Sequence, residues 1–396
     1  MIILGIETSC DETAVAVVEH NPKKGDFFIH SNIISSQVKI HSKYGGIVPE
    51  IAARNHVVNI IPVVDEALSH RAISCKAINH KYSTLNDEVD RKKPTAYDLK
   101  LKACAIDAIA VTNGPGLITS LLVGVETAKV LAYVWNKPLI AVNHLEGHIC
   151  SAMSQKNKKT KKQKNTFDFP ALALIVSGGH TQLILMTDYG KYKIIGETRD
   201  DAAGEAFDKV GKLLGLGYPG GPAISAYAKK FQNPNNKLQT NSKFKTIKLP
   251  RPMINSKDFD FSFSGLKTAV LYSLKAISHK AVRCKVTERM PITYNLQLTA
   301  EMCAEFQQAV IDVLATKTLK ATKKYDAKTI ILCGGVSANK ELRKRFEKEF
   351  GDKLLLPGPG LSTDNAVMIA MAGVRHFRER NFIELNKIKV DPNLTL

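Results

Sequence analysis

The chain has 396 residues, 44% of them hydrophobic, and its formal net charge is +19 at pH 7. This length allows two domains with their own cores, whereas a membrane span is excluded because no run of about 18 apolar residues occurs, and seven cysteines without a C-x-x-C pair argue against a disulfide framework. The charge favours a polyanionic partner, nucleic acid above all, although a composition rich in Lys, Ile and Asn also arises without any function.

Residues 2–18 predict a β-hairpin with a tip rich in hydroxyl and acidic side chains. Apolar runs flank the polar segment Glu7–Thr13 on both sides. Asp11 and Glu12 lie in this tip; they are either solvated turn residues or groups that bind a metal, position an amine or transfer a proton. No basic or Arg-rich targeting segment precedes the hairpin, so we expect a cytoplasmic protein.

Strands and helices then alternate, which is typical of an α/β protein. The patterns predict a turn and helix start at 45–56, a strand at 109–111, an apolar helix at 117–133 and a strand at 138–142.

The segment Asn143–His148 contains two histidines at positions i and i+4. On a helix, His144 and His148 project from one face and are close enough to share a divalent metal. Glu146 is at i+2 from His144 and points elsewhere, so the pattern is not the H-E-x-x-H of metalloproteases. The alternative is a pair of polar residues on a solvated helix.

Residues 171–186 repeat the plan of the first hairpin, with the tip at 177–181. A repeat distance of about 170 residues exceeds any solenoid period and indicates two homologous domains. A strand at 329–332 and a helix at 340–349 follow in the second half.

Several glycine-rich turns come at strand ends, where backbone N–H groups can approach phosphate oxygens. They occupy residues 113–116, 177–181, 219–222 and 334–339. None is a Walker A loop or a dinucleotide fingerprint, but together they favour a nucleotide held between two domains. Asp208, at helical spacing in 202–209, is either a surface acid or an acceptor for a ribose or other hydroxyl.

Asp364 precedes the apolar run 367–372 in a sequence typical of a helix N-cap. Asp364 is either only the cap or the third ligand of the metal, because an acid at a helix start is rigidly directed.

Two charged segments, 75–100 and 156–164, have the character of insertions. The second holds Lys156, Lys158, Lys159, Lys161, Lys162 and Lys164. It is either a low-complexity loop or a contact for RNA phosphates.

Taken together, these motifs closely resemble one family, that of the tRNA N6-adenosine threonylcarbamoyltransferases (TsaD), once described as O-sialoglycoprotein endopeptidases. The resemblance covers nearly the whole chain except the two insertions. It is carried by residues 6–13, 46–50, the His144/His148 pair, 177–181, 201–209, 261–267 and 362–366.

The resemblance implies an actin-like ATPase-domain fold with two ribonuclease-H-like halves around a nucleotide cleft. We accordingly expect an N-terminal half at 1–142, a C-terminal half with the metal and nucleotide sites at 143–372, and a tail at 373–396 that packs back on the first half.

It also implies transfer of threonylcarbamoyl from threonylcarbamoyl-AMP to N6 of adenosine 37 in tRNAs that read codons beginning with A. His144, His148 and Asp364 match the metal ligands of the family, with iron (Fe²⁺) expected and zinc possible. Asp11 or Glu12 would orient the amine or accept its proton. The positions that match the adenylate site are Ile175, Val176, Ser177, Gly178, Gly179, Asp208, Gly221 and Asn339.

The implied partners are a paralogous TsaB-type subunit and a TsaE-type P-loop ATPase. The alternatives are a metallopeptidase, although the sequence lacks the H-E-x-x-H base, and an ATP-driven binding module, in which the histidine pair would have no function.

Overall fold

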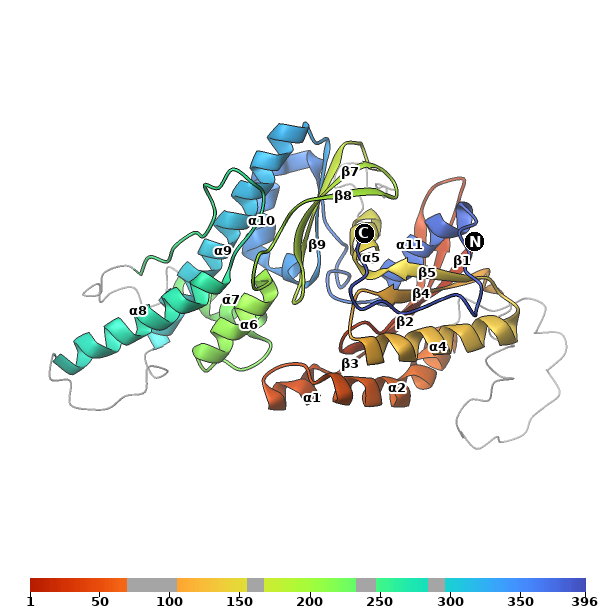
Figure 1. Cartoon of the computed structure of the whole chain (residues 1–396), viewed down its shortest axis with the longest axis horizontal. Helices are drawn as coiled ribbons and strands as arrows, with labels where there is room; N and C mark the ends of the chain where they lie inside the picture. The colour runs from red at the N-terminus through yellow and green to blue at the C-terminus, as the bar shows by residue number, and fades with distance from the viewer. Residues whose placement is uncertain (70–104, 155–166, 233–246, 284–295) are drawn as a thin grey trace. The chain divides into compact units, whose positions relative to one another are not determined.

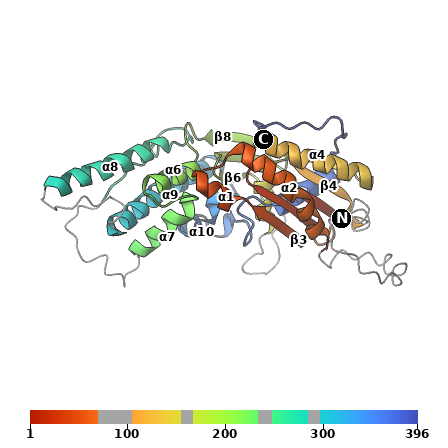
Figure 2. The same cartoon turned by 90° about the horizontal axis from the view of Figure 1, so that it is seen from below.

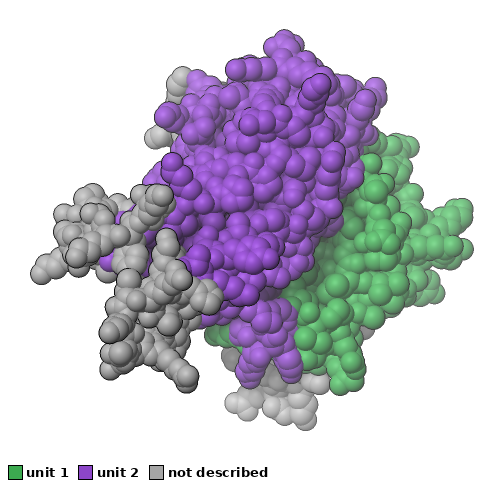
Figure 3. Space-filling view, turned by 60° about the vertical axis from the view of Figure 1, so that its left-hand side comes forward, with its two compact units in different colours: residues 1–40, 47–166, 357–396 green, residues 41–46, 167–356 purple. Residues whose placement is uncertain are grey.

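The computed structural model describes five stretches of the chain, residues 1–69, 105–154, 167–232, 247–283 and 296–396. They form two compact units (Figure 3). Unit 1 comprises residues 1–40, 47–166 and 357–396, and unit 2 comprises residues 41–46 and 167–356. The two charged segments of the sequence analysis, 75–100 and 156–164, lie outside the described residues.

A five-stranded sheet forms the centre of unit 1, in the order β3-β2-β1-β4-β5. β1 pairs antiparallel with β2 and parallel with β4, so that Leu4 lies opposite both Val17 and Ile109. The strands are β1 (Ile2–Glu7), β2 (Glu12–His20), β3 (Phe27–Ser36), β4 (Ala108–Gly114) and β5 (Leu139–Asn143).

Unit 2 repeats this topology, with the order β8-β7-β6-β9-β10. β6 pairs antiparallel with β7 and parallel with β9. The strands are β6 (Ala171–Val176), β7 (Thr181–Asp188), β8 (Lys191–Glu197), β9 (Thr329–Cys333) and β10 (Leu354–Leu355). Both predicted hairpins and the α/β fold with two ribonuclease-H-like halves are thereby confirmed. The third antiparallel strands, β3 and β8, are additions that the sequence analysis did not predict.

Helices cover both faces of the unit 1 sheet. Figures 1 and 2 show α2 (Pro49–Ser69) and α4 (Ile118–Trp135) on one face, where they pack on Leu4 and Ile6. α11 (Ala366–Arg378) covers the other face. It is apolar all round its first turns, as expected of a helix buried on several sides. The short helix α1 (Val38–His41) precedes α2.

Among the described residues, α4 is the one helix long and apolar enough to cross a membrane. Its inner face is buried in unit 1 against β4, α2 and the rest of the core. Core packing therefore accounts for much of its apolar character.

The core of unit 2 lies between its sheet and several helices. Leu172, Leu174 and Val176 of β6 share one cluster with Phe207 and Phe306. The helices are α6 (Ala203–Leu213), α7 (Gly220–Gln232), α8 (Ser264–Arg283), α9 (Leu296–Tyr325) and α10 (Lys340–Phe350).

The units divide the chain differently from the expected boundaries at 142/143 and 372/373. Residues 143–154 and 357–372 belong to unit 1, because α5 (His144–Ser151) and α11 pack on each other and α11 packs on β1. The tail also lies on unit 1, where Ile383 bridges to Leu139 and the amide of Asp391 bonds the carbonyl of Asn113.

Candidate active site

The histidine pair lies at the start of α5, directly after β5. Asn143 caps the helix by accepting a hydrogen bond from the amide of Leu145. The rings of His144 and His148 pack edge to face, with centroids 4.6 Å apart and planes at 81°. The helix and its shared histidine face are thus as predicted. The alternative of a solvated helix is wrong, since His144 is 6% and His148 0% exposed.

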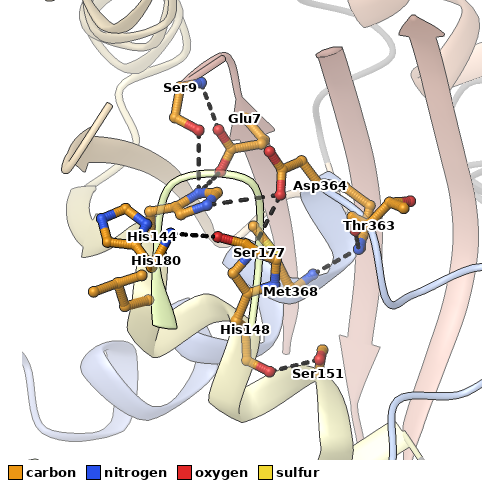
Figure 4. Close-up of polar contacts among 12 residues, drawn as sticks. Glu7, Ser9, His144, His148, Ser151, Ser177, His180, Thr363, Asp364 and Met368 are labelled. Atoms are coloured by element: carbon orange, nitrogen blue, oxygen red, sulfur yellow. Dashed lines mark hydrogen bonds and ion pairs between the residues drawn. The ribbon is translucent and has the colours of Figure 1, made fainter. Parts of the chain in front are cut away.

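Asp364 meets both histidines within unit 1 (Figure 4). Its Oδ1 lies 3.1 Å from His148 Nε2 and 3.6 Å from His144 Nε2. Asp364 is not the N-cap of α11; that role belongs to Asn365, whose side chain accepts a hydrogen bond from the amide of Met368. The carboxylate of Asp364 is therefore directed at the histidines rather than at the helix.

The three side chains fit a divalent metal. Their ligand atoms all lie within 4.8 Å of one another, and metal–ligand bonds of about 2.0–2.2 Å place neighbouring ligands about 3–3.5 Å apart. His148 is fully buried, and its Nε2 contacts Asp364 Oδ1 at 3.1 Å without hydrogen-bond geometry. A metal between these two atoms would satisfy both of them. Three protein ligands also leave an open coordination position for a substrate.

Glu7, the last residue of β1, is a member of this site that the sequence analysis missed. It is 0% exposed. Its Oε1 accepts from the amide of Ser9 at 2.6 Å, and its Oε2 accepts from the hydroxyl of Thr112 at 2.6 Å and lies 3.1 Å from His144 Nδ1. An acid that ends an otherwise apolar strand was the available signal.

Electrostatics couple Glu7 and His144. Burial alone would raise the pKa of Glu7, but the charge and hydrogen bond of His144, with the Thr112 hydroxyl, outweigh it and lower that pKa. Burial would likewise lower the pKa of His144, but Glu7 and Asp364 raise it to about 9. In the metal-free protein the pair is therefore carboxylate and imidazolium, and a metal must displace a proton from His144.

The other side of α5 fixes the helix to α11. Glu146 Oε2 lies 2.9 Å from His376 Nε2, and its Oε1 lies 3.2 Å from a guanidinium nitrogen of Arg375. Glu146 thus points away from the histidine face, as predicted. Gly147 permits the close approach, because a Cβ there would lie 2.8 Å from Ile369 Cδ1. The contact keeps the two histidines in register with Asp364.

The acidic tip between β1 and β2 is not a solvated turn. Asp11 is 6% exposed. Burial, together with the charges of Asp364 and Asp11, raises the pKa of Glu12 to about 10. His56 of α2 contacts this tip at two points: its Nδ1 lies 2.8 Å from the Thr13 hydroxyl, and its Nε2 lies 3.0 Å from the Cys10 carbonyl oxygen. Both candidate acids thus lie in an ordered loop that is close enough to Asp364 for its charge to raise the pKa of Glu12.

The proposed adenylate residues are all in unit 2. Ile175 and Val176 are fully buried in β6, where they lie opposite Gln182 and Thr181 of β7. Ser177 begins the tip, and its hydroxyl accepts from the amide of His180 at 3.0 Å. A Cβ at Gly178 or Gly179 would meet nothing within 4 Å. The tip therefore presents backbone to open space.

Three further residues of this group contribute to helix starts in unit 2. Asp208 Oδ1 accepts from the amide of Gly220 at 2.7 Å, where α7 begins with Gly220 and Gly221. Asn339 caps α10 by accepting from the amides of Glu341 and Leu342. Its amide group donates to Gln307 Oε1 at 2.8 Å and to the Ser225 hydroxyl at 3.0 Å. Their role toward a nucleotide remains a prediction.

Comparison with known proteins gives matches along nearly the whole chain. A family model described as tRNA N6-adenosine threonylcarbamoyltransferase (TsaD) matches residues 28–81 and 95–371. A protein of that name from Syntrophomonas wolfei is 44% identical over 97% of this chain and 95% of the relative. Those from Thermomicrobium roseum and Bacillus subtilis are 45% and 43% identical, covering 94% and 96% of this chain and 91% of each relative. Among solved structures, full-length HypF in its phosphate- and nucleotide-bound form covers 95% of this chain and 46% of its own, with 12% identity and a TM-score of 0.49. The matches to the named relatives include parts of both units.

Proposed function

The chain belongs to the family of tRNA N6-adenosine threonylcarbamoyltransferases, and we propose that it moves threonylcarbamoyl from threonylcarbamoyl-AMP to N6 of adenosine 37. The chain is thus a transferase that acts on tRNA, in this case on tRNAs that read codons beginning with A. The observation that carries the chemistry is the convergence of His144, His148 and Asp364. Neither a peptidase nor an ATP-driven module accounts for this set, because the first lacks the H-E-x-x-H base and the second has no use for two buried histidines.

We assign His144, His148 and Asp364 as ligands of one divalent metal, Fe²⁺ first and Zn²⁺ as the alternative that the same donor atoms accept. When bound, the metal supplies a Lewis acid for the negative charge that develops on the carbonyl or phosphate oxygen of the mixed anhydride. Glu146 contributes indirectly, since its contacts to Arg375 and His376 hold α5 on α11.

The remaining work is positioning, because the adenine amine is weakly nucleophilic and the anhydride is already activated. We assign this role to Asp11 and Glu12, one of which orients the amine or accepts its proton. The ordered loop supports the assignment: Gln37 donates a backbone hydrogen bond to the Asp11 carbonyl, and Ser36 donates its hydroxyl to Glu12. The residues assigned to the adenylate are Ile175, Val176, Ser177, Gly178, Gly179, Asp208, Gly221 and Asn339.

The partners we propose are a paralogous TsaB-type subunit and a TsaE-type P-loop ATPase. In support, α2 and α4 expose apolar side chains on their outer surfaces. This outer apolar face consists of Val57, Val58 and Ile61 of α2 and Ile118, Leu122, Val130 and Tyr133 of α4, exposed by 38% to 77%. Apolar side chains gathered on adjacent helices are typical of a protein interface, and we assign this one to the paralogous subunit.

The test is transfer of radiolabelled threonylcarbamoyl from synthetic threonylcarbamoyl-AMP to purified tRNA, with the partner subunits present. We expect modified adenosine with the parent protein and at least a 100-fold lower rate with Asp364→Ala, in line with loss of a metal's contribution. Parallel assays of casein cleavage and of ATP turnover without tRNA address the two other functions. Transfer that is absent while either of these activities is present would contradict the proposal.

A further inference from the structure

Glu7 is buried at the end of β1 and contacts a proposed ligand rather than the metal position itself. Its carboxylate accepts hydrogen bonds from two donors, the backbone amide of Ser9 and the side-chain hydroxyl of Thr112 on β4. These bonds leave one oxygen, Oε2, 3.1 Å from Nδ1 of His144 (Figure 4). The position of the carboxylate is therefore determined by β1 and β4, independently of α5.

We propose that Glu7 is a positioning residue that fixes the ring of His144 with the proton on Nδ1 and the lone pair on Nε2. This inference rests on the metal site proposed above. An ionised carboxylate only accepts hydrogen bonds, so the nitrogen facing Glu7 must carry hydrogen. The nitrogen that faces Asp364, at 3.6 Å, is Nε2. The tautomer set by Glu7 is the one that can bind a metal between His144 and Asp364.

Ser9 offers a competing arrangement that the geometry disfavours. Its hydroxyl also lies 3.1 Å from His144 Nδ1, and it donates to this nitrogen if the ring proton is on Nε2. That arrangement would direct the lone pair of Nδ1 at the carboxylate of Glu7 and place the proton on Nε2. Since Glu7 is fully buried, bulk solvent does not screen this repulsion. The Ser9 oxygen instead acts as a second acceptor for the same N–H.

Glu7 also balances charge. Two neutral histidines and Asp364 bring a single negative charge to a divalent cation, and Glu7 adds the second within hydrogen-bond distance of a ligand. A second carboxylate beside the ligands offsets more of the charge of a divalent cation that binds in this buried site. Glu7 thus favours a divalent metal by its charge as well as by the tautomer.

Glu7→Gln tests both effects with little change of shape. The amide of Ser9 is a fixed donor, so the new side chain must place its oxygen at the Oε1 position and its NH₂ group at the Oε2 position. That NH₂ group then faces Nδ1 of His144, which must accept, and the proton moves to Nε2. Thr112 can rotate its hydroxyl to accept as well, so the fold is preserved.

The measurement is Zn²⁺ affinity of the full chain by chelator competition. Glu7→Gln should raise the dissociation constant about 10- to 100-fold. Glu19→Gln is the matched control, since Glu19 makes a comparable bond to His30 in the same unit at 2.9 Å, and it should change the constant less than threefold. A Glu7→Gln value within threefold of the parent would overturn the inference.

A second measurement uses the parent protein and does not depend on folding of the variant. In long-range ¹H–¹⁵N spectra of the Zn²⁺-loaded protein with labelled histidine, His144 should show a protonated Nδ1 and a metal-bound Nε2. The opposite assignment overturns the inference. His148→Ala separates the two proposals: if that variant binds Zn²⁺ as well as the parent does, the metal site itself is wrong, whereas its failure to bind beside an unaffected Glu7→Gln rejects only the role of Glu7.

Discussion

Burial determines what individual side chains can do at this site. His148 is fully buried; its Nδ1 makes no hydrogen bond with the described residues, and its Nε2 meets Asp364 Oδ1 at 3.1 Å without hydrogen-bond geometry. A buried polar group without a hydrogen bond costs about 1–3 kcal/mol, and a metal at Nε2 removes that cost there. Stability and metal binding are therefore linked at His148, because a ligand that binds only the folded state stabilises it.

We predict that His148→Ala loses the metal while cooperative unfolding is retained. The ligand set drops to His144 and Asp364, too few for tight binding. Elemental analysis after dialysis, combined with thermal unfolding with and without added Zn²⁺, checks this. The parent should gain stability on adding Zn²⁺, and the variant should not. His30→Asn, a histidine of the same unit that is bonded to Glu19, serves as control and should keep its metal; unchanged metal in His148→Ala would contradict the assignment.

The sequence is a sufficient guide to the ligands but not to their surroundings. His144 and His148 follow from helical spacing, and Asp364 follows from its place before an apolar run. The sequence shows Glu7 as an acid at the end of an apolar strand, but its role does not follow, because its partners Thr112 and His144 are 105 and 137 residues away in the chain. Only the parallel pairing of β1 with β4, and of β4 with β5, brings these three residues together. A buried polar network of this kind is a property of the fold rather than of any local pattern.

Asn339, at the start of α10 in unit 2, both caps its own helix and contacts two others. The side-chain oxygen of Asn339 caps α10, while its amide nitrogen bonds Gln307 on α9 and Ser225 on α7. Helix N-termini also attract phosphate groups. Substitutions at Asn339 must therefore distinguish the cap from a role in binding.

We predict that Asn339→Asp weakens adenylate binding more than tRNA binding while it preserves the cap. An aspartate oxygen still accepts from Glu341 and Leu342, but it cannot donate and it repels phosphate. Asn339→Ala should in addition cost about 1 kcal/mol of stability through the lost cap. Calorimetric titration with AMP and filter binding of tRNA give the two affinities. Equal losses in both assays would remove Asn339 from the adenylate site.

The start of α8 is held by a residue from another segment. Asp200 accepts hydrogen bonds from the amides of Phe263 and Ser264 and from the hydroxyls of Ser262 and Ser264. Burial alone would raise the pKa of Asp200, but these hydrogen bonds outweigh it and lower that pKa. A carboxylate at a helix N-terminus has the favourable sign for the helix dipole.

We predict that Asp200→Asn destabilises the protein by about 1 kcal/mol at neutral pH, the usual value of a helix cap, and progressively less in acid. Because the folded pKa is lowered, the contribution of the carboxylate is fully present above the unfolded pKa of about 3.9 and is lost as the pH falls through the folded value. Urea unfolding between pH 3 and 7 of parent and variant measures the difference. A difference that stays constant down to the lowest pH would show that the charge of Asp200 is unimportant.

At the scale of the whole molecule, the repeated hairpins predict two related halves. They do not predict which residues belong to each half. β3 and β8 were not predicted, because exposed and buried residues do not alternate regularly along these two strands. The boundary expected after residue 142 differs from the observed units, because α5 packs on α11 and both helices belong to unit 1. Contacts between residues more than 200 positions apart, such as Glu146 with Arg375, determine this assignment.

The apolar side chains of the outer apolar face of α2 and α4 are exposed, so packing in the core of unit 1 does not explain them. Val58 and Tyr133 are 71% and 77% exposed, and each belongs to a helix whose other face is buried in unit 1. We predict that Val58→Lys and Val58→Glu each weaken binding of the paralogous subunit at least tenfold. Both should act in the same direction, because the cost is that of burying a charge in an apolar interface and does not depend on its sign.

The matched control for this prediction is Phe28→Lys, which changes an apolar residue of β3 in the same unit that is 60% exposed and lies outside the face. It should leave the affinity within twofold of the parent. Sedimentation velocity of the purified subunits gives the dissociation constants, and Zn²⁺ binding confirms that the metal site is intact in every variant. If Val58→Lys and Val58→Glu bind the subunit as tightly as Phe28→Lys does, the partner uses a different surface, and the exposed residues of α2 and α4 then need another explanation.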